Sequence, residues 1–212
     1  MKLKTFHTAL TVALLALALS PMVDIESPWT RQKTKPDKSQ GAIVSQQLGI
    51  ESWVQIAYHR PAMRGRDVWT AKNQRDQLLV PRGDTTPWRA GANEATTIEF
   101  SRSAWFEGHE VDAGKYALYM IPGDESWTLI LQSFDNQWGA GGYDKANDIV
   151  RATVVPQTAP ESEWLTYGFT NCEDWTAMAY LHWGRVKVPF EVGVNARRQP
   201  GGGQPRDDLD GR

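Results

Sequence analysis

The sequence has little cysteine, since Cys172 is the only one in 212 residues. A lone thiol cannot form a disulfide within the chain, so the fold must be held together by its hydrophobic core. Zinc sites built from paired cysteines are excluded for the same reason. Nothing near Cys172 in the sequence would activate it as a nucleophile, and we interpret it as an inert small residue.

Positive charge is not in excess either, because the formal net charge is −2 at pH 7. Nucleic-acid binding requires a basic surface that neutralises phosphates, so we exclude nucleic acid as a partner. The Gly-x-Ser-x-Gly and His-Glu-x-x-His motifs of common hydrolases are missing. The spacing of His59, His109 and His182 carries no metal-ligand signature, and we expect neither a metal nor another cofactor.

Long hydrophobic runs are limited to residues 9–19, which are too few for a bilayer span of roughly 20 residues. Lys2 and Lys4 precede this run, as in a secretory signal peptide. Residues 18–20 provide small side chains at cleavage spacing, although Pro21 follows them. We therefore expect a protein exported to the bacterial periplasm or medium. An uncleaved leader is the alternative, and it would be the protein's only attachment to the membrane.

The chain divides into four segments by composition. We assign residues 1–23 to the signal peptide and 24–40 to a polar linker. Residues 41–196 form one domain, long enough for a sizeable core. Residues 197–212 are rich in glycine and aspartate, and we expect this tail to be disordered.

Alternation of apolar and polar side chains dominates the domain. Val54, Ile56 and Tyr58 face one way while Trp53 and Gln55 face the other, which is the period of a strand. Turn signals separate eight or nine such segments, and only residues 71–79 could form a helical turn or two. The prediction is a single all-β domain, an antiparallel β-sandwich of the jelly-roll or immunoglobulin-like kind. The other alternating segments are residues 96–100, 116–120, 127–131, 149–155, 165–169, 177–183 and 186–194.

The block from Trp88 to Thr97 concentrates the polar chemistry. Arg89 offers a planar set of donors suited to a carboxylate or phosphate, and Asn93 and Glu94 add an amide and an acid. One interpretation is a recognition site at the mouth of the sandwich. The other is a buried network in which Arg89 and Glu94 pair and Asn93 holds a loop, because buried polar groups need partners.

Arginines and tryptophans supply further candidates. Arg64 and Arg66 follow a strand exit and could join Arg82 and Arg89 in an anion-binding mouth, although arginines at turns are ordinary surface residues. Of the ten tryptophans, those on predicted strands (Trp53, Trp127 and Trp183) are interpreted as core packing. Trp88 and Trp138 lie beside loop signals, where a flat ring could stack on a sugar, and packing is again the alternative.

Several short motifs follow one another along the domain in a distinctive order. They are residues 45–49, 58–61, 64–66, 88–97, 113–116, 121–122, 127–128, 137–140, 143–144 and 148–151. Together they resemble the domain of unknown function 2911, a family of exported bacterial domains. The resemblance covers nearly the whole domain, with residues 70–77 looking like extra residues in a usually tighter loop. It implies an envelope or secreted location and no established activity.

The leading functional hypothesis is non-catalytic binding of a small anionic or glycan-like ligand at a loop-rich end of the sandwich. Sandwich loops cluster at the sheet ends, so distant segments can converge there. One alternative is a hydrolase of envelope polymers with Glu94 as acid or base. Another is a structural or assembly protein of the cell envelope. The expected ligand-binding residues are Arg64, Arg66, Trp88, Arg89, Asn93, Glu94 and Trp138.

Overall fold

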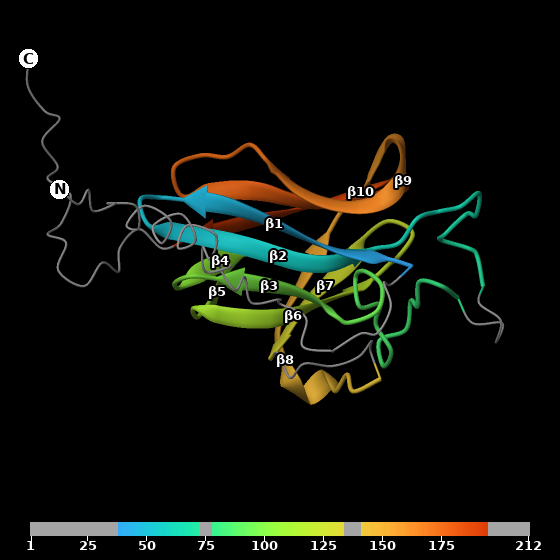
Figure 1. The fold of residues 1–212 in the computed structure, drawn as a ribbon. Coiled ribbons are helices and arrows are strands. Elements are labelled where there is room, and N and C mark those ends of the chain that lie inside the picture. The colour runs from blue at the N-terminus through green and yellow to red at the C-terminus, as the bar shows by residue number, and fades with distance from the viewer. Residues whose placement is uncertain (1–37, 73–77, 134–140, 195–212) are drawn as a thin grey trace, which may run out of the picture. The chain divides into compact units, whose positions relative to one another are not determined.

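Two antiparallel sheets face each other in the computed structural model, which describes residues 38–72, 78–133 and 141–194 (Figure 1). Strands of the larger sheet are, in spatial order, β1 (Gln40–Leu48), β2 (Ser52–Arg60), β3 (Thr96–Phe100), β6 (Gly114–Ile121), β7 (Trp127–Ser133) and β8 (Asp148–Val154). The smaller sheet has the order β5 (His109–Val111), β4 (Ala104–Phe106), β10 (Thr176–Val194) and β9 (Gln157–Thr170). This arrangement confirms the predicted all-β sandwich.

The core lies between the two sheets because each strand turns its apolar side inward. Val54 and Ile56 on β2 and Ile98 on β3 are fully buried. Phe190 and Val192 on β10 are buried opposite them in the same cluster. The apolar side chains whose two-residue spacing predicted the strands are thus the ones that fill the interior.

The outward side of the larger sheet differs from one half to the other. Near β6 and β7 it carries a small second cluster, in which Tyr119 and Ile130 are buried with Ala95 and Ala117. Near the turn between β1 and β2 it is open, and Trp53 remains 37% exposed. The interpretation of Trp53 as core packing is therefore wrong. Its side chain has the opposite phase to Val54, so it points away from the core.

The last strand differs from its prediction. Residues 177–183 and 186–194 were expected to be separate strands, but both belong to the continuous strand β10. The pairing of β10 with β9 shifts register on both sides of Gly184, which has a φ of 59°. A glycine in this conformation allows a bulge, and the bulge bends the strand without ending it.

The prediction from sequence also missed or misassigned several small elements. β4 and β5 contain three residues each, which is too short for a clear alternation. The predicted helical turns at residues 71–79 are not seen at the described ends of that segment, where Lys72 pairs with Leu78 as a β-bridge. The helix that the described residues do contain is a single 3-10 turn, η1 (Lys145–Asn147). No helix in the described ranges is long and apolar enough to span a membrane.

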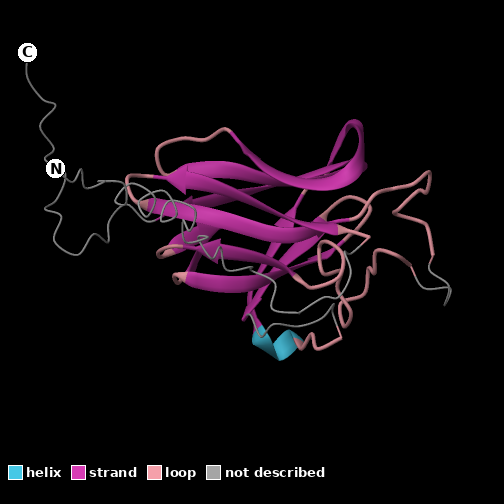
Figure 2. Ribbon diagram, in the orientation of Figure 1, coloured by secondary structure: helices cyan, strands magenta, loops and turns pink. Residues whose placement is uncertain are grey.

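The long connection from β2 to β3 runs over one end of the sandwich (Figure 2). Four β-bridges fix its course: Ala62 pairs with Trp164 on β9, Lys72 with Leu78 and Arg82 with Pro87 within the connection, and Trp88 with Met120 on β6. The β6–β7 and β8–β9 turns lie at the same end, because β7 begins and β8 ends there. Segments distant in sequence therefore meet at this end, which we call the loop-rich end.

Burial at the inner face predicts unequal effects of two isoleucine substitutions. Ile98→Ala removes a fully buried side chain from the core, and we expect it to lower the free energy of unfolding by about 2–5 kcal/mol. Ile149→Ala on β8 removes a side chain that is 48% exposed and should change it by less than about 1 kcal/mol. Urea unfolding followed by tryptophan fluorescence measures both. Equal effects would contradict the assignment of inner and outer faces.

Candidate functional site

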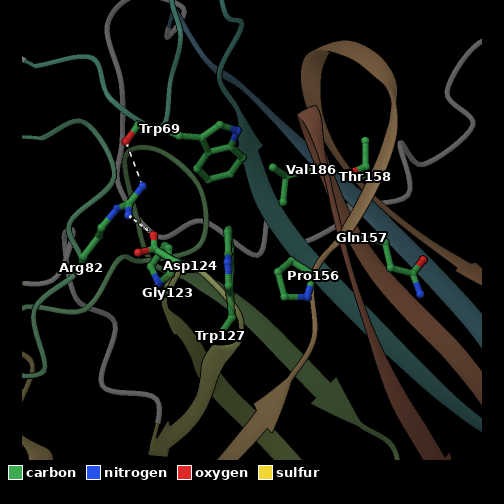
Figure 3. A pocket seen from close by; sticks show the side chains of 10 residues that line it. Trp69, Arg82, Gly123, Asp124, Trp127, Pro156, Gln157, Thr158 and Val186 are labelled. Carbon is green, nitrogen blue, oxygen red and sulfur yellow. Dashed lines mark hydrogen bonds and ion pairs between the residues drawn. The ribbon is translucent and has the colours of Figure 1, made fainter.

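A cavity of about 340 Å³ opens at the loop-rich end (Figure 3). It lies where the β2–β3 connection meets the β6–β7 turn and the start of β9. Its wall combines aromatic, aliphatic and polar side chains. The lining includes Trp69, Arg82, Asp124, Trp127, Gln157 and Val186.

The aromatic wall is part of a larger tryptophan cluster. Trp69 lies at its centre, with ring centroids 5.3 Å from Trp127, 5.7 Å from Trp183 and 6.1 Å from Trp88. These three contacts are edge-to-face, whereas Trp88 stacks on Trp183 at 6.2 Å and 16°. Such ring pairs add about 0.5–1.5 kcal/mol each beyond area burial. The cavity wall is consequently rigid.

The polar side of the cavity includes one guanidinium. Arg82 lies 3.4 Å from Asp124 and donates to the backbone oxygen of Trp69 at 3.3 Å. The Asp124 side chain is 97% exposed. An ion pair this exposed contributes only about 0–1 kcal/mol, so a ligand carboxylate or hydroxyl could replace Asp124 at little cost.

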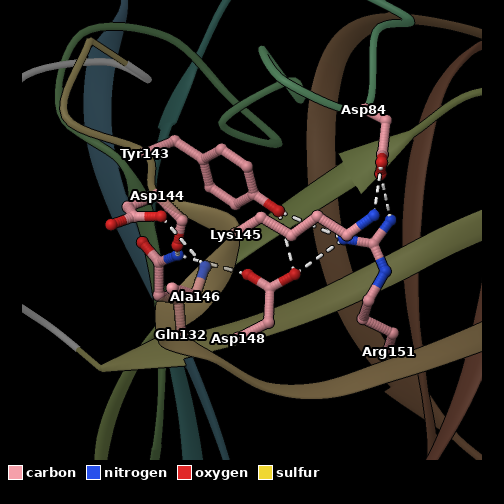
Figure 4. Close-up of polar contacts among 8 residues, drawn as sticks. All are labelled: Asp84, Gln132, Tyr143, Asp144, Lys145, Ala146, Asp148 and Arg151. Atoms are coloured by element: carbon pink, nitrogen blue, oxygen red, sulfur yellow. Dashed lines mark hydrogen bonds and ion pairs between the residues drawn. The ribbon is translucent and has the colours of Figure 1, made fainter.

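A charged cluster on the outer side of β8 holds the loop that carries Arg82 (Figure 4). The Asp84 carboxylate accepts hydrogen bonds from Lys145 Nζ at 2.6 Å and from Arg151 Nη2. Arg151 also donates to Asp148 at 2.6 Å, and the Tyr143 hydroxyl donates to Asp148 at 2.9 Å. One carboxylate thus joins the β2–β3 connection to both η1 and β8.

The position of Asp84 makes this cluster relevant to the cavity. Arg82 pairs with Pro87, so Asp84 lies in a tight turn only two positions from the cavity residue. The hydrogen bond from Lys145 lowers the pKa of Asp84 below its usual 3.8, against partial burial, and Arg151 lowers it further. Burial, followed by the hydrogen bond to Asp148, raises the pKa of Tyr143 to about 12. At neutral pH the carboxylate is ionised and the phenol neutral, as the cluster requires.

The central polar block forms a separate loop, which we call the 89–95 loop. Trp88 exchanges two backbone hydrogen bonds with Met120, and Thr96 pairs with Leu118, so the residues between them leave the sheet. Ala90 and Asn93 have φ values of 54° and 58°. The carbonyl oxygen of Ala90 accepts from the Thr96 and Tyr167 hydroxyls at 3.0 and 2.8 Å. These bonds stabilise a conformation that an alanine rarely adopts.

Glycine is required within this loop by close packing. A Cβ on Gly91 would lie 2.7 Å from the Thr96 hydroxyl oxygen and 3.3 Å from the His59 carbonyl oxygen. The Trp88 indole N–H donates to the Gly91 carbonyl at 3.1 Å, which closes the loop onto the tryptophan cluster. Asn93 donates to the carbonyl of Ser39 at 3.1 Å, just before β1.

The acid of the block lies in a buried polar group rather than in the cavity. Glu94 is 3.4 Å from His59 Nε2, on the outer side of β2, and both side chains are buried. Burial lowers the pKa of Arg89, and the charges of Glu94 and Tyr119 oppose that change. His59 is thus a buried neighbour of Glu94 that the sequence did not suggest. This arrangement resembles the structural alternative, with His59 added to Arg89 and Glu94.

The predicted binding residues do not converge on the cavity. Trp88 is 2% exposed and lies inside the tryptophan cluster, so its ring is not displayed to a ligand. The Arg66 guanidinium donates to the carbonyls of Ala62 and Met63 and so fastens its own turn. The Arg64 N–H binds the Glu163 carboxylate. Arg89, Asn93 and Glu94 share the 89–95 loop, and Trp138 lies outside the described residues.

Several cavity residues had no clear signal in the sequence. Arg82 was noted as one of a set of arginines, and Trp127 was interpreted as packing, as its burial confirms. Trp69, Asp124 and Gln157 stand in ordinary turn or strand contexts. Only the approach of three separate turns brings them together. In the described ranges, His59, His109 and His182 lie on three different strands and no group of potential metal ligands occurs.

Comparison with known proteins identifies a family but no activity. The family model described as "Protein of unknown function (DUF2911)" matches residues 39–192. The chain belongs to this family, as its sequence resemblance predicted. Neither the curated proteins nor the solved structures gave a match.

The charged cluster predicts that replacing the Asp84 carboxylate by an amide changes hydrogen exchange in its turn. Asp84→Asn keeps the shape of the side chain but removes its charge, and we expect faster hydrogen exchange of the amides in residues 82–87. In the wild type, the protection of these amides relative to their intrinsic exchange rates should also decrease as the pH falls below 3.8, because the cluster requires an ionised carboxylate and its pKa is lowered below that value. Hydrogen-exchange mass spectrometry measures both changes.

Asp124→Asn serves as the control, since it removes only the exposed partner of Arg82. We expect it to leave exchange in residues 82–87 within twofold of the wild type. Unchanged exchange in Asp84→Asn would show that the cluster does not hold the turn.

Proposed function

We propose that this member of the DUF2911 family is a non-catalytic binding protein that takes a small glycan-like ligand in the cavity at the loop-rich end. The observation that carries the proposal is the wall of that cavity, where Trp69 and Trp127 face a rim of Arg82, Asp124 and Gln157. Binding sites of this kind combine a mainly apolar surface with a few fixed polar groups.

Sugar chemistry suits this combination. A pyranose ring has a C–H face that packs against an indole, and its hydroxyls form hydrogen bonds around the edge. The tryptophan cluster holds Trp69 in place, so little side-chain entropy is lost on binding. The volume of about 340 Å³ is near the lower end for ligand sites, which favours one or two sugar units over a long chain.

The charge of the cavity is compatible with an acidic sugar as well as a neutral one. Arg82 and Asp124 balance each other in the absence of ligand. Because the pair is exposed and weak, a uronic-acid carboxylate could take the place of Asp124 and receive the planar donors of Arg82. Arg82 would then favour carboxylated ligands.

The distribution of carboxylates supports binding rather than hydrolysis. Glycosidases use two carboxyl groups about 5–10 Å apart. Among the described residues that line the cavity, Asp124 is the one carboxylate, and it is almost fully exposed. Glu94, the candidate acid or base of the hydrolase alternative, is paired with His59 on the outer side of β2.

Calorimetric titration with a panel of mono- and disaccharides, including glucuronic acid, tests the proposal. We expect micromolar to millimolar binding by the wild type. Gln157→Ala, an exposed truncation, should weaken binding without destabilising the fold. Trp69→Ala should weaken it about tenfold or more, since one aromatic contact and its buried area are worth at least about 1.4 kcal/mol.

Trp105→Ala is the matched control, because Trp105 on β4 is 39% exposed and does not line the cavity. It should bind like the wild type. Arg82→Gln should selectively weaken glucuronic acid. No binding to any member of the panel, or equal binding by wild type and Trp69→Ala, would refute the proposal.

We further propose that the protein acts outside the cytoplasm, in the periplasm or the medium. The support is the basic and apolar leader in residues 1–23, which lies outside the described residues. Expression of the full chain followed by fractionation and intact-mass measurement should find an exported chain lacking about 23 residues. A full-length chain in the membrane fraction would indicate an uncleaved anchor, and a full-length chain in the cytosol would refute export.

A further inference from the structure

The open half of the larger sheet carries a second cavity, of about 530 Å³, over the β1–β2 hairpin. The registers place it far from the first. Val54, next to the second cavity, pairs with Phe100 on β3, and Phe100 pairs with Gly114 at the start of β6. The first cavity lies beyond Ile121, the end of the same strand. The two cavities therefore occupy opposite ends of the sheet.

Four side chains form a flat platform in the second cavity, which we call the β1–β2 platform. Ser45 lies directly opposite Gln55, and Gln47 directly opposite Trp53, so all four point to the same outward face. Trp53 is 37% exposed on this face, beside the turn between β1 and β2. An indole on a strand is usually buried, and here it is presented to solvent between two amides.

The backbone beneath the platform is held firmly. The Trp53 N–H donates to the Ser101 hydroxyl at 2.8 Å. The Ser45 hydroxyl lies 3.3 Å from the Val54 carbonyl, and the Gln47 amide donates to the Ile50 carbonyl at 2.9 Å. These bonds fix the hairpin and limit the entropy lost when a ligand settles on it.

The composition of the platform decides which ligand it fits. Glu51 is the one charged residue among the described residues of the lining, so an anionic ligand would meet only repulsion. The Gln55 amide, the side-chain oxygens of Ser45 and Gln47, which can accept hydrogen bonds, and an exposed indole instead match an uncharged, hydroxyl-rich ligand.

The length of this exposed surface indicates that the ligand is extended. Ile43, which is 45% exposed, continues the outward row of β1 beyond Ser45 and Gln47. From Ile43 to Gln47 this row is roughly 13 Å long, since a strand rises about 3.3 Å per residue. A row of this length can contact more than one sugar ring in succession. We propose that the β1–β2 platform binds a neutral polysaccharide chain.

This inference stands apart from the small-ligand cavity at the loop-rich end, because it rests on different residues and a different ligand size. Trp69→Ala therefore tests one site and Trp53→Ala the other. Since Trp53 points away from the core, its replacement by alanine should leave the fold intact, as thermal unfolding can verify.

Affinity electrophoresis of the full chain in native gels tests the platform, with laminarin and dextran as neutral polysaccharides and alginate as an anionic one. We expect at least one neutral polymer to retard the wild type and alginate not to do so. Trp53→Ala should reduce the affinity about tenfold and Gln55→Ala by a smaller factor. Trp69→Ala and the exposed control Trp105→Ala should both migrate like the wild type.

Each other result overturns the inference. Absence of retardation by both neutral polymers, or retardation by alginate alone, would show that the platform does not have this ligand. Equal retardation of wild type and Trp53→Ala would place any polysaccharide binding elsewhere. If Trp69→Ala abolished retardation while Trp53→Ala did not, the polymer would be bound at the loop-rich end and not on the platform.

Discussion

The burial of Trp88 is the constraint on which the rest of the loop-rich end depends. Its backbone pairs with Met120 on β6, its indole N–H bonds the Gly91 carbonyl, and its ring stacks on Trp183. The first contact attaches the β2–β3 connection to the sheet. The second closes the 89–95 loop, and the third supports Trp69 at the cavity wall. The sequence left both ligand contact and packing open for this tryptophan, and the structure buries it as an internal anchor.

Charge has two different roles in this domain, and burial separates them. The Asp84 cluster is partly exposed, so its value lies in positioning a turn rather than in overall stability. The pair of His59 and Glu94 is buried on the outer side of the sheet, where a missing partner would leave a desolvated group. Charged residues that look alike in sequence thus hold an exposed turn in the Asp84 cluster and a buried loop at Glu94.

The two proposed ligand surfaces differ in shape for a structural reason. The cavity at the loop-rich end is bordered by three turns and the tryptophan cluster, and this suits a small ligand. The β1–β2 platform is flat because no loop among the described residues crosses the first two strands near Trp53, and this suits an extended one. With both proposed surfaces occupied, the protein would stay on a polymer through one surface while it binds a short sugar in the other.

The sequence by itself determined the strands, the sandwich and the family. It also determined which side chains face inward, because alternation is a local property of an extended backbone. That same phase placed Trp53 outside, although its size suggested packing. Short strands such as β4, and the bulge at Gly184 within β10, escaped prediction because neither changes the local pattern enough.

Only the tertiary structure decided where the functional surfaces lie. Trp69 and Trp127 meet because strand order brings the β2–β3 connection against the start of β7. Glu94 meets His59, and its charge also acts on Arg89, because the 89–95 loop folds back over β2. Such contacts depend on which strands pair and on how the turns between them close, and no local pattern of residues contains that information.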